Sequence, residues 1–414
     1  MKTRPDMKTA LDGIRVLDLT RVLAGPWCAQ NLADLGAEVI KVERPGSGDD
    51  TRGWGPPFLK DRDGNDTDSS AYYLAANRGK KSVTIDISTA AGQQAVRELA
   101  KISDIVLENY KVGQLKKYGL DYASLREVNP GIIFCSVTGF GQTGPWAHRP
   151  GYDFIVQAMG GLMSVTGEAD DQPGGGPQKV GIAVADLMTG LYATQAVLAA
   201  LFHRQRTGEG QSIDMALLDV QVAAMANMNT NYLVSGQPPK RWGNAHPNLV
   251  PYQTFKASDG WIIIAVGNDE QYKRFCETGG RPELASDPRF LRVRDRINNR
   301  PELIPLLAEM VATKTSEQWI AQLEAASVPC GPINDLAQVF RNPQVLARGL
   351  RVDIEREDTG PVKLVGSPMK LSATPVSYKL PPPRLGEHTQ EILGGLLGYD
   401  DDRIAQVSST GSGE

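Results

Sequence analysis

The first 140 residues alternate short β-rich runs with helical stretches, and this alternation constrains the fold more than any other feature of the chain. The β-rich run Ile14–Leu19 leads through a turn into a helical stretch over Trp27–Leu35, which Gly36 ends, and then into a second β-rich run, Glu38–Glu43. Such a unit predicts two parallel strands joined by a right-handed crossover. Further elements follow in the same alternation: strands at Ser82–Ile87, Asp104–Glu108 and Ile132–Val137, and a helix at Ala90–Lys101. The chain is therefore predicted to be α/β, with an open Rossmann-like parallel sheet and helices on both faces.

The pattern changes after the middle of the chain. A long apolar helix over Leu187–Arg206, a strand from Ser212 and a second helix over Leu217–Leu233 precede a region of hairpins and short helices. At 414 residues the chain exceeds what one core usually organises. We expect a large α/β domain from residues 1–225, a small α+β domain at 226–329, and a C-terminal part, 330–414, that returns to the large domain.

Composition excludes several classes of function. The 44 basic and 48 acidic residues give a net charge of -4, which offers no electrostatic reason to bind nucleic acid. No leader or membrane span is predicted, and four cysteines without a CxxC pair are typical of free thiols in a reducing compartment. We therefore expect a cytoplasmic protein. The four histidines are scattered, so their spacing predicts no metal site.

The first βα turn does not carry a dinucleotide fingerprint. Arg21–Pro26 has one glycine, and the GxGxxG spacing is missing. Glu43 lies where a ribose-binding acid would end the second strand, but Arg44 after it suits a phosphate better. The polar loop Gly46–Ser70 is longer than a structural connection needs, which is typical of functional loops.

Asp186 is the residue that stands out most for chemistry. It lies in the segment GIAVADLMTG, where an apolar run meets the long apolar helix. An aspartate there can cap the helix by accepting backbone N–H bonds. It can equally serve as a positioned carboxylate nucleophile. The sequence alone leaves both interpretations open.

Several stretches, in order along nearly the whole chain, resemble the class III CoA-transferase family. This family contains formyl-CoA transferase, carnitine-related CoA-transferases and α-methylacyl-CoA racemase. The stretches are GIRVLDLTRVLAGP, EVIKVERPGSGD, VLENYKVGQLKKYG, SVTGFGQTGP, the segment from Val184 to TGEGQ, VPCGPI and LGEHT. Two more, RWGNAHPNLVPYQTF and TRGWGPP, are similar to the succinate–hydroxymethylglutarate CoA-transferase branch.

The resemblance implies roles for individual residues. Asp186 takes the position of the family's nucleophile, and Tyr152 and Asp153 match a pair that lines the site. Arg44, Lys111 and Lys117 are fit to meet CoA phosphates, whereas Ser88 stands where family members often have lysine. The implied CoA contacts are Leu23, Ala24, Arg44, Ile85, Asp86, Ile87, Ser88, Asn109, Tyr110, Lys111 and Lys117.

The reaction implied is a ping-pong transfer of CoA from an acyl-CoA to a carboxylic acid. Asp186 would form an acyl anhydride and then an aspartyl-CoA thioester. Backbone N–H groups near the start of its helix are expected to stabilise the oxyanions. The donor is expected to be succinyl-CoA or another dicarboxyl-CoA, with Arg241 and His246 near the remote carboxylate. CoA is then a substrate, no tightly bound cofactor is expected, and the family implies an interlocked homodimer.

Two other functions stay open at this point. A racemase of the same family needs a histidine where Tyr152 stands, and a phenol, with a pKa of about 10, is a poor base at neutral pH. The second alternative is a non-catalytic CoA- or nucleotide-binding module in which Asp186 only caps its helix.

Overall fold

The computed structural model describes residues 9–409. They form two compact units, which are described separately. The first unit comprises the chain up to Leu162, Val180–Val234 and the chain from Gln344 onward. The second comprises Met163–Lys179 and Ser235–Pro343.

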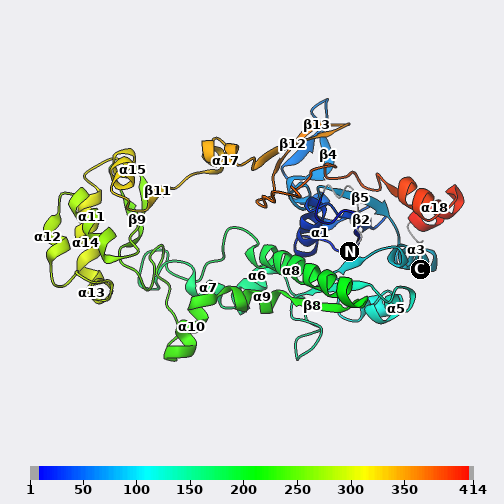
Figure 1. Cartoon of the computed structure of the whole chain (residues 1–414), viewed down its shortest axis with the longest axis horizontal. Helices are drawn as coiled ribbons and strands as arrows, with labels where there is room; N and C mark the ends of the chain where they lie inside the picture. Colours follow the sequence, from blue (N-terminus) through cyan, green and yellow to red (C-terminus); the bar gives the residue numbers. More distant parts are fainter. Residues whose placement is uncertain (1–8, 410–414) are drawn as a thin grey trace. The chain divides into compact units, whose positions relative to one another are not determined.

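A six-stranded sheet organises the first unit (Figure 1), with all neighbouring strands parallel and in the order β5-β2-β1-β6-β7-β8. The central strand β1 places Val16 between Val39 of β2 and Ile105 of β6. The strands are β1 (Arg15–Asp18), β2 (Glu38–Glu43), β5 (Lys80–Thr84), β6 (Ile105–Glu108), β7 (Ile133–Thr138) and β8 (Ser212–Ala216). The predicted α/β class with a parallel sheet is confirmed.

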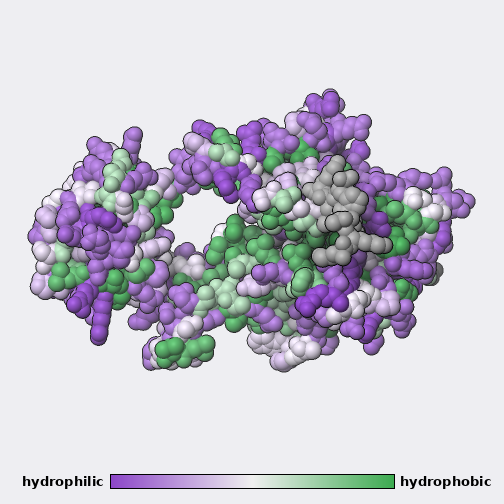
Figure 2. Space-filling model, in the orientation of Figure 1, coloured by the Kyte–Doolittle hydropathy of each residue, from purple (hydrophilic) through white to green (hydrophobic). Residues whose placement is uncertain are grey.

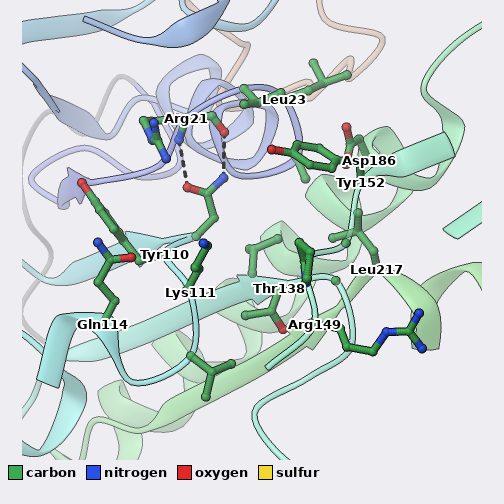
Figure 3. A pocket seen from close by; sticks show the side chains of 18 of the residues that line it. Arg21, Leu23, Tyr110, Lys111, Gln114, Thr138, Arg149, Tyr152, Asp186 and Leu217 are labelled. Carbon is green, nitrogen blue, oxygen red and sulfur yellow. Dashed lines mark hydrogen bonds between the residues drawn. The ribbon is translucent and has the colours of Figure 1, made fainter. Parts of the chain in front are cut away.

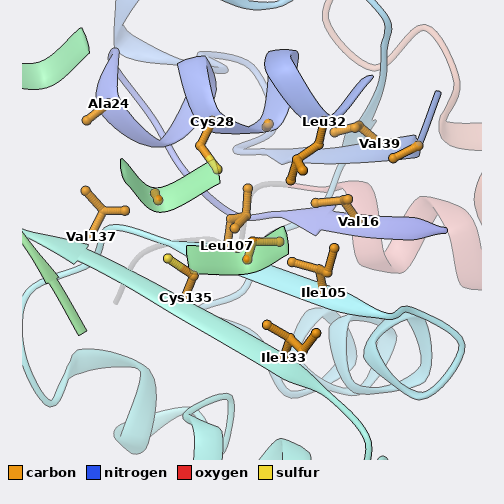
Figure 4. Close-up of a cluster of buried hydrophobic side chains, with 14 of the residues drawn as sticks. Val16, Ala24, Cys28, Leu32, Val39, Ile105, Leu107, Ile133, Cys135 and Val137 are labelled. Atoms are coloured by element: carbon orange, nitrogen blue, oxygen red, sulfur yellow. The ribbon is translucent and has the colours of Figure 1, made fainter. Parts of the chain in front are cut away.

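Helices cover both faces of this sheet because each buried strand alternates its side chains between two cores. Val16 belongs to the core under α1 (Ala24–Asp34) and α8 (Val184–Thr207), which Figure 4 shows, whereas Leu17 belongs to the opposite core. The opposite face carries α3 (Ala90–Lys101), α5 (Tyr122–Val128), η2 (Gln390–Leu396) and α18 (Asp401–Ser408). The remaining elements of this unit include α2 (Ala71–Ala76), α4 (Gln114–Lys117), α6 (Asp153–Met159), α9 (Leu217–Ala224), the hairpin β3 (Phe58–Lys60) and β4 (Asp66–Ser70), the short η1 (Asp50–Gly53), and the hairpin β12 (Arg351–Arg356) and β13 (Gly360–Val365).

Helix α8 is long and apolar enough to span a membrane by length and composition alone. Ala193, Val197 and Leu201, however, pack into the core of the first unit together with side chains of α1. The burial of this face explains the apolar composition of α8 as that of a core helix. Its other face is exposed at Leu191 and Phe202, and Figure 2 shows apolar surface in the region of α8 and α10 (Ala226–Ser235).

The C-terminal segment closes the outer edge of the sheet at β5. The N–H of His388 donates to the carbonyl of Ser82 at 2.9 Å, and the N–H of Asp86 donates to the carbonyl of Val407 at 3.0 Å. The hydroxyl of Ser408 also donates to the carbonyl of Thr84 at 3.0 Å. Residues after 380 therefore occupy the edge of a strand that lies 300 residues earlier in the chain.

The second unit contains a small antiparallel sheet in the order β11-β10-β9. Its core surrounds the fully buried Phe275 and Trp319. The elements of this region are β9 (Tyr252–Lys256), β10 (Trp261–Ala265), β11 (Cys330–Pro332), α11 (Asp269–Thr278), α12 (Pro282–Ser286), α13 (Val293–Asn298), α14 (Arg300–Val311), α15 (Ser316–Ala325) and α16 (Leu336–Val339); α7 (Leu162–Val165) and α17 (Pro343–Ala347) span the boundaries between the units.

The helix predicted over Leu217–Leu233 is wrong as one continuous element. The structure has α9 and α10, separated at Met225, and Ala226 adopts a left-handed backbone with φ of 43°. Neither glycine nor proline occurs at this break, so the sequence carried no signal for it. The segment Gly46–Ser70, predicted as a loop, contains η1 and the β3–β4 hairpin.

Candidate functional site

Two adjoining cavities lie at the carboxyl edge of the parallel sheet, where ligands of open α/β sheets bind. The first cavity has a volume of about 380 Å³ and is lined by residues that follow β1, β6 and β7, together with Asp186 of α8 and Leu217 of α9. The second, of about 370 Å³, is lined by residues at the ends of β2 and β5. Arg21, Asp50, Tyr110 and Gln114 line both, so the two cavities meet at these side chains.

The first cavity contains seven of the residues singled out in the sequence. Figure 3 shows Asp186, Tyr152 and Leu23 on one side of it and Tyr110 and Gln114 on the other. The seven are Leu23, Ala24, Asn109, Tyr110, Lys111, Tyr152 and Asp186.

The second cavity contains the other CoA contacts that the resemblance implied, except one. Arg44 lines it with an exposed side chain, next to the segment Ile85, Asp86, Ile87 and Ser88. Lys117 is exposed on α4 and lines neither of these two cavities. Its role in binding a CoA phosphate stays a prediction.

Asp186 is not the cap of its helix. Helix α8 begins at Val184. Its N-cap position is Ala183, whose side chain makes no capping hydrogen bond. Asp153 takes the capping role instead, since its Oδ1 accepts the N–H groups of Ala185 at 2.8 Å and Asp186 at 3.3 Å. Within residues 9–409 no side chain donates a hydrogen bond to the Asp186 carboxylate, which is therefore left for chemistry.

The surroundings of Asp186 make its carboxylate unusually basic. Burial, followed by the negative charge of Asp153, raises the pKa of Asp186 to about 7. Asp153 is itself held by the buried Gln157, whose amide donates to Asp153 Oδ2 at 2.6 Å. A carboxylate with a raised pKa and no salt bridge is typical of a catalytic group.

Two close backbone approaches bring these residues together. A Cβ on Gly190 would lie 2.7 Å from the carbonyl oxygen of Ala24, so this glycine lets α8 pack directly on the start of α1. Asp186 lies one turn earlier on the same face of α8. A Cβ on Gly139 would lie 2.5 Å from the Cα of Gly151, and this contact sets the segment with Tyr152 against the end of β7.

The site also contains aromatic residues that the sequence did not single out. Trp54, after η1, lines the first cavity and packs edge-on against Tyr72 of α2, with ring centroids 5.2 Å apart. Burial and then the charges of Asp186 and Asp153 raise the pKa of Tyr72 to about 12. The length of the loop Gly46–Ser70 was the available signal, but it indicated a functional segment and no particular residue.

Arg21 is another residue that the sequence did not single out. Its guanidinium lies where the two cavities meet, forms a salt bridge with Asp50 at 2.9 Å and lies 5.9 Å from the centre of the Tyr110 ring. The ribose-binding interpretation of Glu43, in contrast, has no support. The carboxylate of Glu43 is buried and already accepts two hydrogen bonds from Arg52, at 2.7 and 2.8 Å.

Arg241 and His246 lie in the second unit, whereas Asp186 lies in the first. Arg241 donates through Nε to the carbonyl of Glu168 at 3.0 Å and pairs with the exposed carboxylate of Asp170. Burial and then the charge of Arg300 lower the pKa of His246, which favours its neutral imidazole. Their part in substrate binding stays a prediction.

Comparison with known proteins identifies what this chain resembles. Residues 11–389 match the model of CoA-transferase family III. The chain is 51% identical over 396 residues to the succinate–glutarate CoA-transferase of Agrobacterium fabrum, covering 96% of this chain and 98% of that protein. It is 44% identical to the human succinyl-CoA:glutarate CoA-transferase, covering 97% of this chain and 89% of the human protein. The crystal structure of a CaiB/BaiF family protein from Brucella suis superposes with a TM-score of 0.84 at 48% identity, covering 94% of this chain and all of that one.

Proposed function

The chain belongs to CoA-transferase family III, and we propose that it moves coenzyme A from succinyl-CoA or another dicarboxyl-CoA to a second carboxylic acid. The names of the Agrobacterium and human relatives support dicarboxylic substrates. The observation that carries the proposal is the position of the Asp186 carboxylate. This carboxylate neither caps a helix nor forms a salt bridge, and it lines a cavity that continues into a second one.

Asp186 acts as the nucleophile in this proposal. An ionised Asp186 oxygen attacks the thioester carbonyl of the donor, the carbon–sulfur bond breaks, and a mixed anhydride forms as CoA leaves as its thiolate. The thiolate then attacks the aspartyl carbonyl, which breaks the anhydride, releases the donor acid and leaves an aspartyl-CoA thioester. An acceptor carboxylate reverses these steps. Covalent storage keeps the thioester energy from being lost to water.

The oxyanions of these steps need donors other than those expected from the sequence. The N–H groups of Ala185 and Asp186 already donate to Asp153. We propose the start of α1 in their place, because no side chain caps this helix and the N–H groups of Ala24 and Gly25 have no acceptor within it. The partial positive charge of a helix N-terminus favours a developing oxyanion.

CoA would extend through both cavities. The thioester lies beside Asp186 in the first, and the nucleotide lies in the second beside Arg44 and the segment 85–88. Arg21, at the junction, and Lys111, in the first cavity, supply cations along the path of the phosphates. Two connected cavities lined by cationic side chains support the binding of an extended anionic ligand.

Two features favour transferase chemistry over the alternatives. Tyr152 lines the first cavity where the racemase would carry a histidine. Asp186 does not cap α8, which removes the reason to treat the chain as a binding module alone. Arg241, paired with Asp170 and 10% exposed, is proposed to hold the remote carboxylate of the dicarboxylate.

The assembly proposed is an interlocked homodimer in the cytoplasm. Exposed apolar side chains on α8 and α10, among them Leu191, Phe202, Leu233 and Val234, support association with a second subunit. All four cysteines are free and three of them are buried, which supports a reducing compartment.

Incubation with succinyl-CoA and a panel of carboxylic acids tests the function. We expect new acyl-CoA products with dicarboxylic acceptors, and an Asp186 adduct that hydroxylamine or borohydride traps. Asp186→Asn should still bind CoA but lose turnover by roughly three orders of magnitude or more. Exchange of the α-proton of a branched acyl-CoA without transfer would support the racemase, and CoA binding without either reaction would support the binding module. Transfer by Asp186→Asn at the wild-type rate would remove Asp186 from the mechanism.

A further inference from the structure

Val22 has a backbone conformation that its side chain disfavours. Its φ of 73° lies in the left-handed region, which a β-branched residue rarely adopts. The residue lies between β1 and α1 and lines the first cavity beside Leu23. Such a conformation persists only where the surrounding structure holds it, and it is found most often at functional sites.

Two side chains hold this turn from opposite sides. Asn109 accepts the N–H of Arg21 at 3.0 Å and donates its amide to the carbonyl of Arg21 at 2.7 Å; Figure 3 draws both bonds. Asp49 Oδ1 accepts the N–H of Val22 itself at 3.2 Å. The peptide group between Arg21 and Val22 is thus held at both ends, its carbonyl by Asn109 after β6 and its N–H by Asp49 in the loop after β2.

The Asp49 carboxylate is in turn held by a buried cation. Lys41 Nζ lies 2.9 Å from Asp49 Oδ2, and both side chains are fully buried. Lys41 also donates to the carbonyl of Thr20 at 2.9 Å, two residues before Val22. The N–H and hydroxyl of Thr51 donate to Asp49 Oδ1 at 3.0 and 2.8 Å. One lysine on β2 therefore fixes the carboxylate and the backbone that leads into the turn.

Stability alone does not explain such a pair. Desolvation of two charges offsets much of their attraction, and apolar replacements of a buried pair are often tolerated. An apolar pair could not replace the hydrogen bond that the Asp49 carboxylate accepts from the N–H of the strained residue Val22. That residue lies just before Leu23, the N-cap position of α1, whose uncapped start is contacted by α8 at Gly190.

We infer that Lys41 and Asp49 are positioning residues that hold Val22 in its left-handed conformation and so direct the first N–H groups of α1 toward the acyl oxygen at Asp186. The inference rests on the proposed function for its catalytic consequence. The part of the inference that concerns the conformation of Val22 is independent of the proposed function.

The test replaces both charges together, because a single replacement would leave one charge buried without a partner. In Lys41→Met/Asp49→Leu we expect kcat to fall at least about tenfold, and at most by the roughly 100- to 1,000-fold that loss of an oxyanion donor costs, while KM for acyl-CoA changes less than threefold. Amide hydrogen exchange of the peptide containing Val22 should accelerate. Adding Val22→Gly should recover at least threefold in kcat, because glycine adopts a positive φ without strain.

A second buried pair at the far end of α1 supplies the control. Arg78 and Asp34 lie 2.6 Å apart there, about 15 Å from the start of an 11-residue helix. Asp34→Leu/Arg78→Met should keep kcat and leave the exchange at Val22 unchanged. Wild-type kcat and exchange in the Lys41/Asp49 variant, or no recovery with Val22→Gly, would overturn the inference. If the wild-type protein transfers no CoA, the proposed function is overturned instead. Amide hydrogen exchange at Val22 would then still show whether Lys41 and Asp49 hold its conformation.

Discussion

Asp186 differs from Asp49, another carboxylate near the site, because no cation pairs with it in the described residues. Asp49 is paired with Lys41, and this pairing together with the hydrogen bonds of Thr51 outweighs burial and holds the pKa of Asp49 at about 2. Asp186 is partly buried and has a like charge, Asp153, as its neighbour, and burial and then this charge raise its pKa to about 7. The pKa values of the two aspartates are thus shifted in opposite directions, that of Asp49 downward and that of Asp186 upward.

The first prediction concerns pH. Only ionised Asp186 attacks, so kcat/KM for acyl-CoA should rise about tenfold per pH unit below pH 7 and level off above it, since kcat/KM reports the free enzyme. Asp153→Asn removes the neighbouring negative charge and should move the midpoint to lower pH, while its carbonyl still accepts the N–H groups of α8. Profiles of kcat/KM from pH 5 to 9 measure both. A wild-type midpoint near the ordinary aspartate value of about 4 would contradict the role of burial.

Arg241 is predicted to recognise the remote carboxylate. Loss of charge-assisted hydrogen bonds costs about 1.5–3 kcal/mol, or about 10- to 100-fold. Arg241→Met should therefore lower kcat/KM for succinyl-CoA by that factor and for acetyl-CoA by less than threefold.

Asp170→Asn is the matched control for Arg241, because it removes the internal partner of the guanidinium and leaves the cation. It should preserve or improve use of succinyl-CoA. An equal loss on both thioesters in Arg241→Met, accompanied by the same loss in Asp170→Asn, would show that Arg241 only orders the segment 163–179.

At the scale of elements, the site is the meeting point of two helix starts, α1 and α8. Gly190 permits their contact, since a Cβ there would meet the carbonyl oxygen of Ala24 at 2.7 Å and the Trp27 side chain at 3.0 Å. The two helices also share one core, which includes Cys28 and Val197. A shift between the helices would move Asp186 relative to the turn at Val22.

Gly190→Ala should accordingly lower kcat strongly while the protein still folds. We expect a loss of about 1–3 kcal/mol in the free energy of unfolding from overpacking, and a fall in kcat of about 100-fold, the scale of an ångström-sized misplacement. Denaturant unfolding and steady-state kinetics measure the two effects. Gly395→Ala is the control, because a Cβ at Gly395 in η2 would meet no heavy atom within 4 Å. Unchanged kcat in Gly190→Ala would separate the helix contact from catalysis.

Elements with strong periodic signals were predictable. β2 and α3 begin and end at the predicted residues, because their hydrophobic patterns and flanking turn residues agree. The turn before α1 was placed too long, because α1 begins at Ala24 and accommodates Pro26 within its first turn. Asp186 was singled out from its segment and the family resemblance, whereas Trp54 was not, since its place in the lining of the same cavity and its contact with Tyr72 arise from tertiary packing.

At the scale of the whole molecule, the exposed apolar side chains on α10 call for a partner surface. Leu233 and Val234 are 77% and 83% exposed. We predict that wild-type protein elutes with the mass of a dimer in light scattering, and that Leu233→Asp/Val234→Asp weakens the dimer at micromolar concentration. Leu336→Asp is the control, because Leu336 is 75% exposed but lies on a different helix, α16. A wild-type monomer would contradict the proposed assembly.

The C-terminal segment that closes β5 has a consequence for how the protein is made. All six strands of the sheet are complete once Ala216 has been synthesised. The residues that cover the β5 edge, from Gly386 to Ser408, are synthesised at least 170 residues later. At about 5–20 residues per second, that edge stays open for roughly ten seconds or more after the sheet's last strand is made. An open strand edge pairs readily with other chains. A nascent chain therefore needs protection at β5 throughout this interval, and truncation near residue 380 would make that exposure permanent.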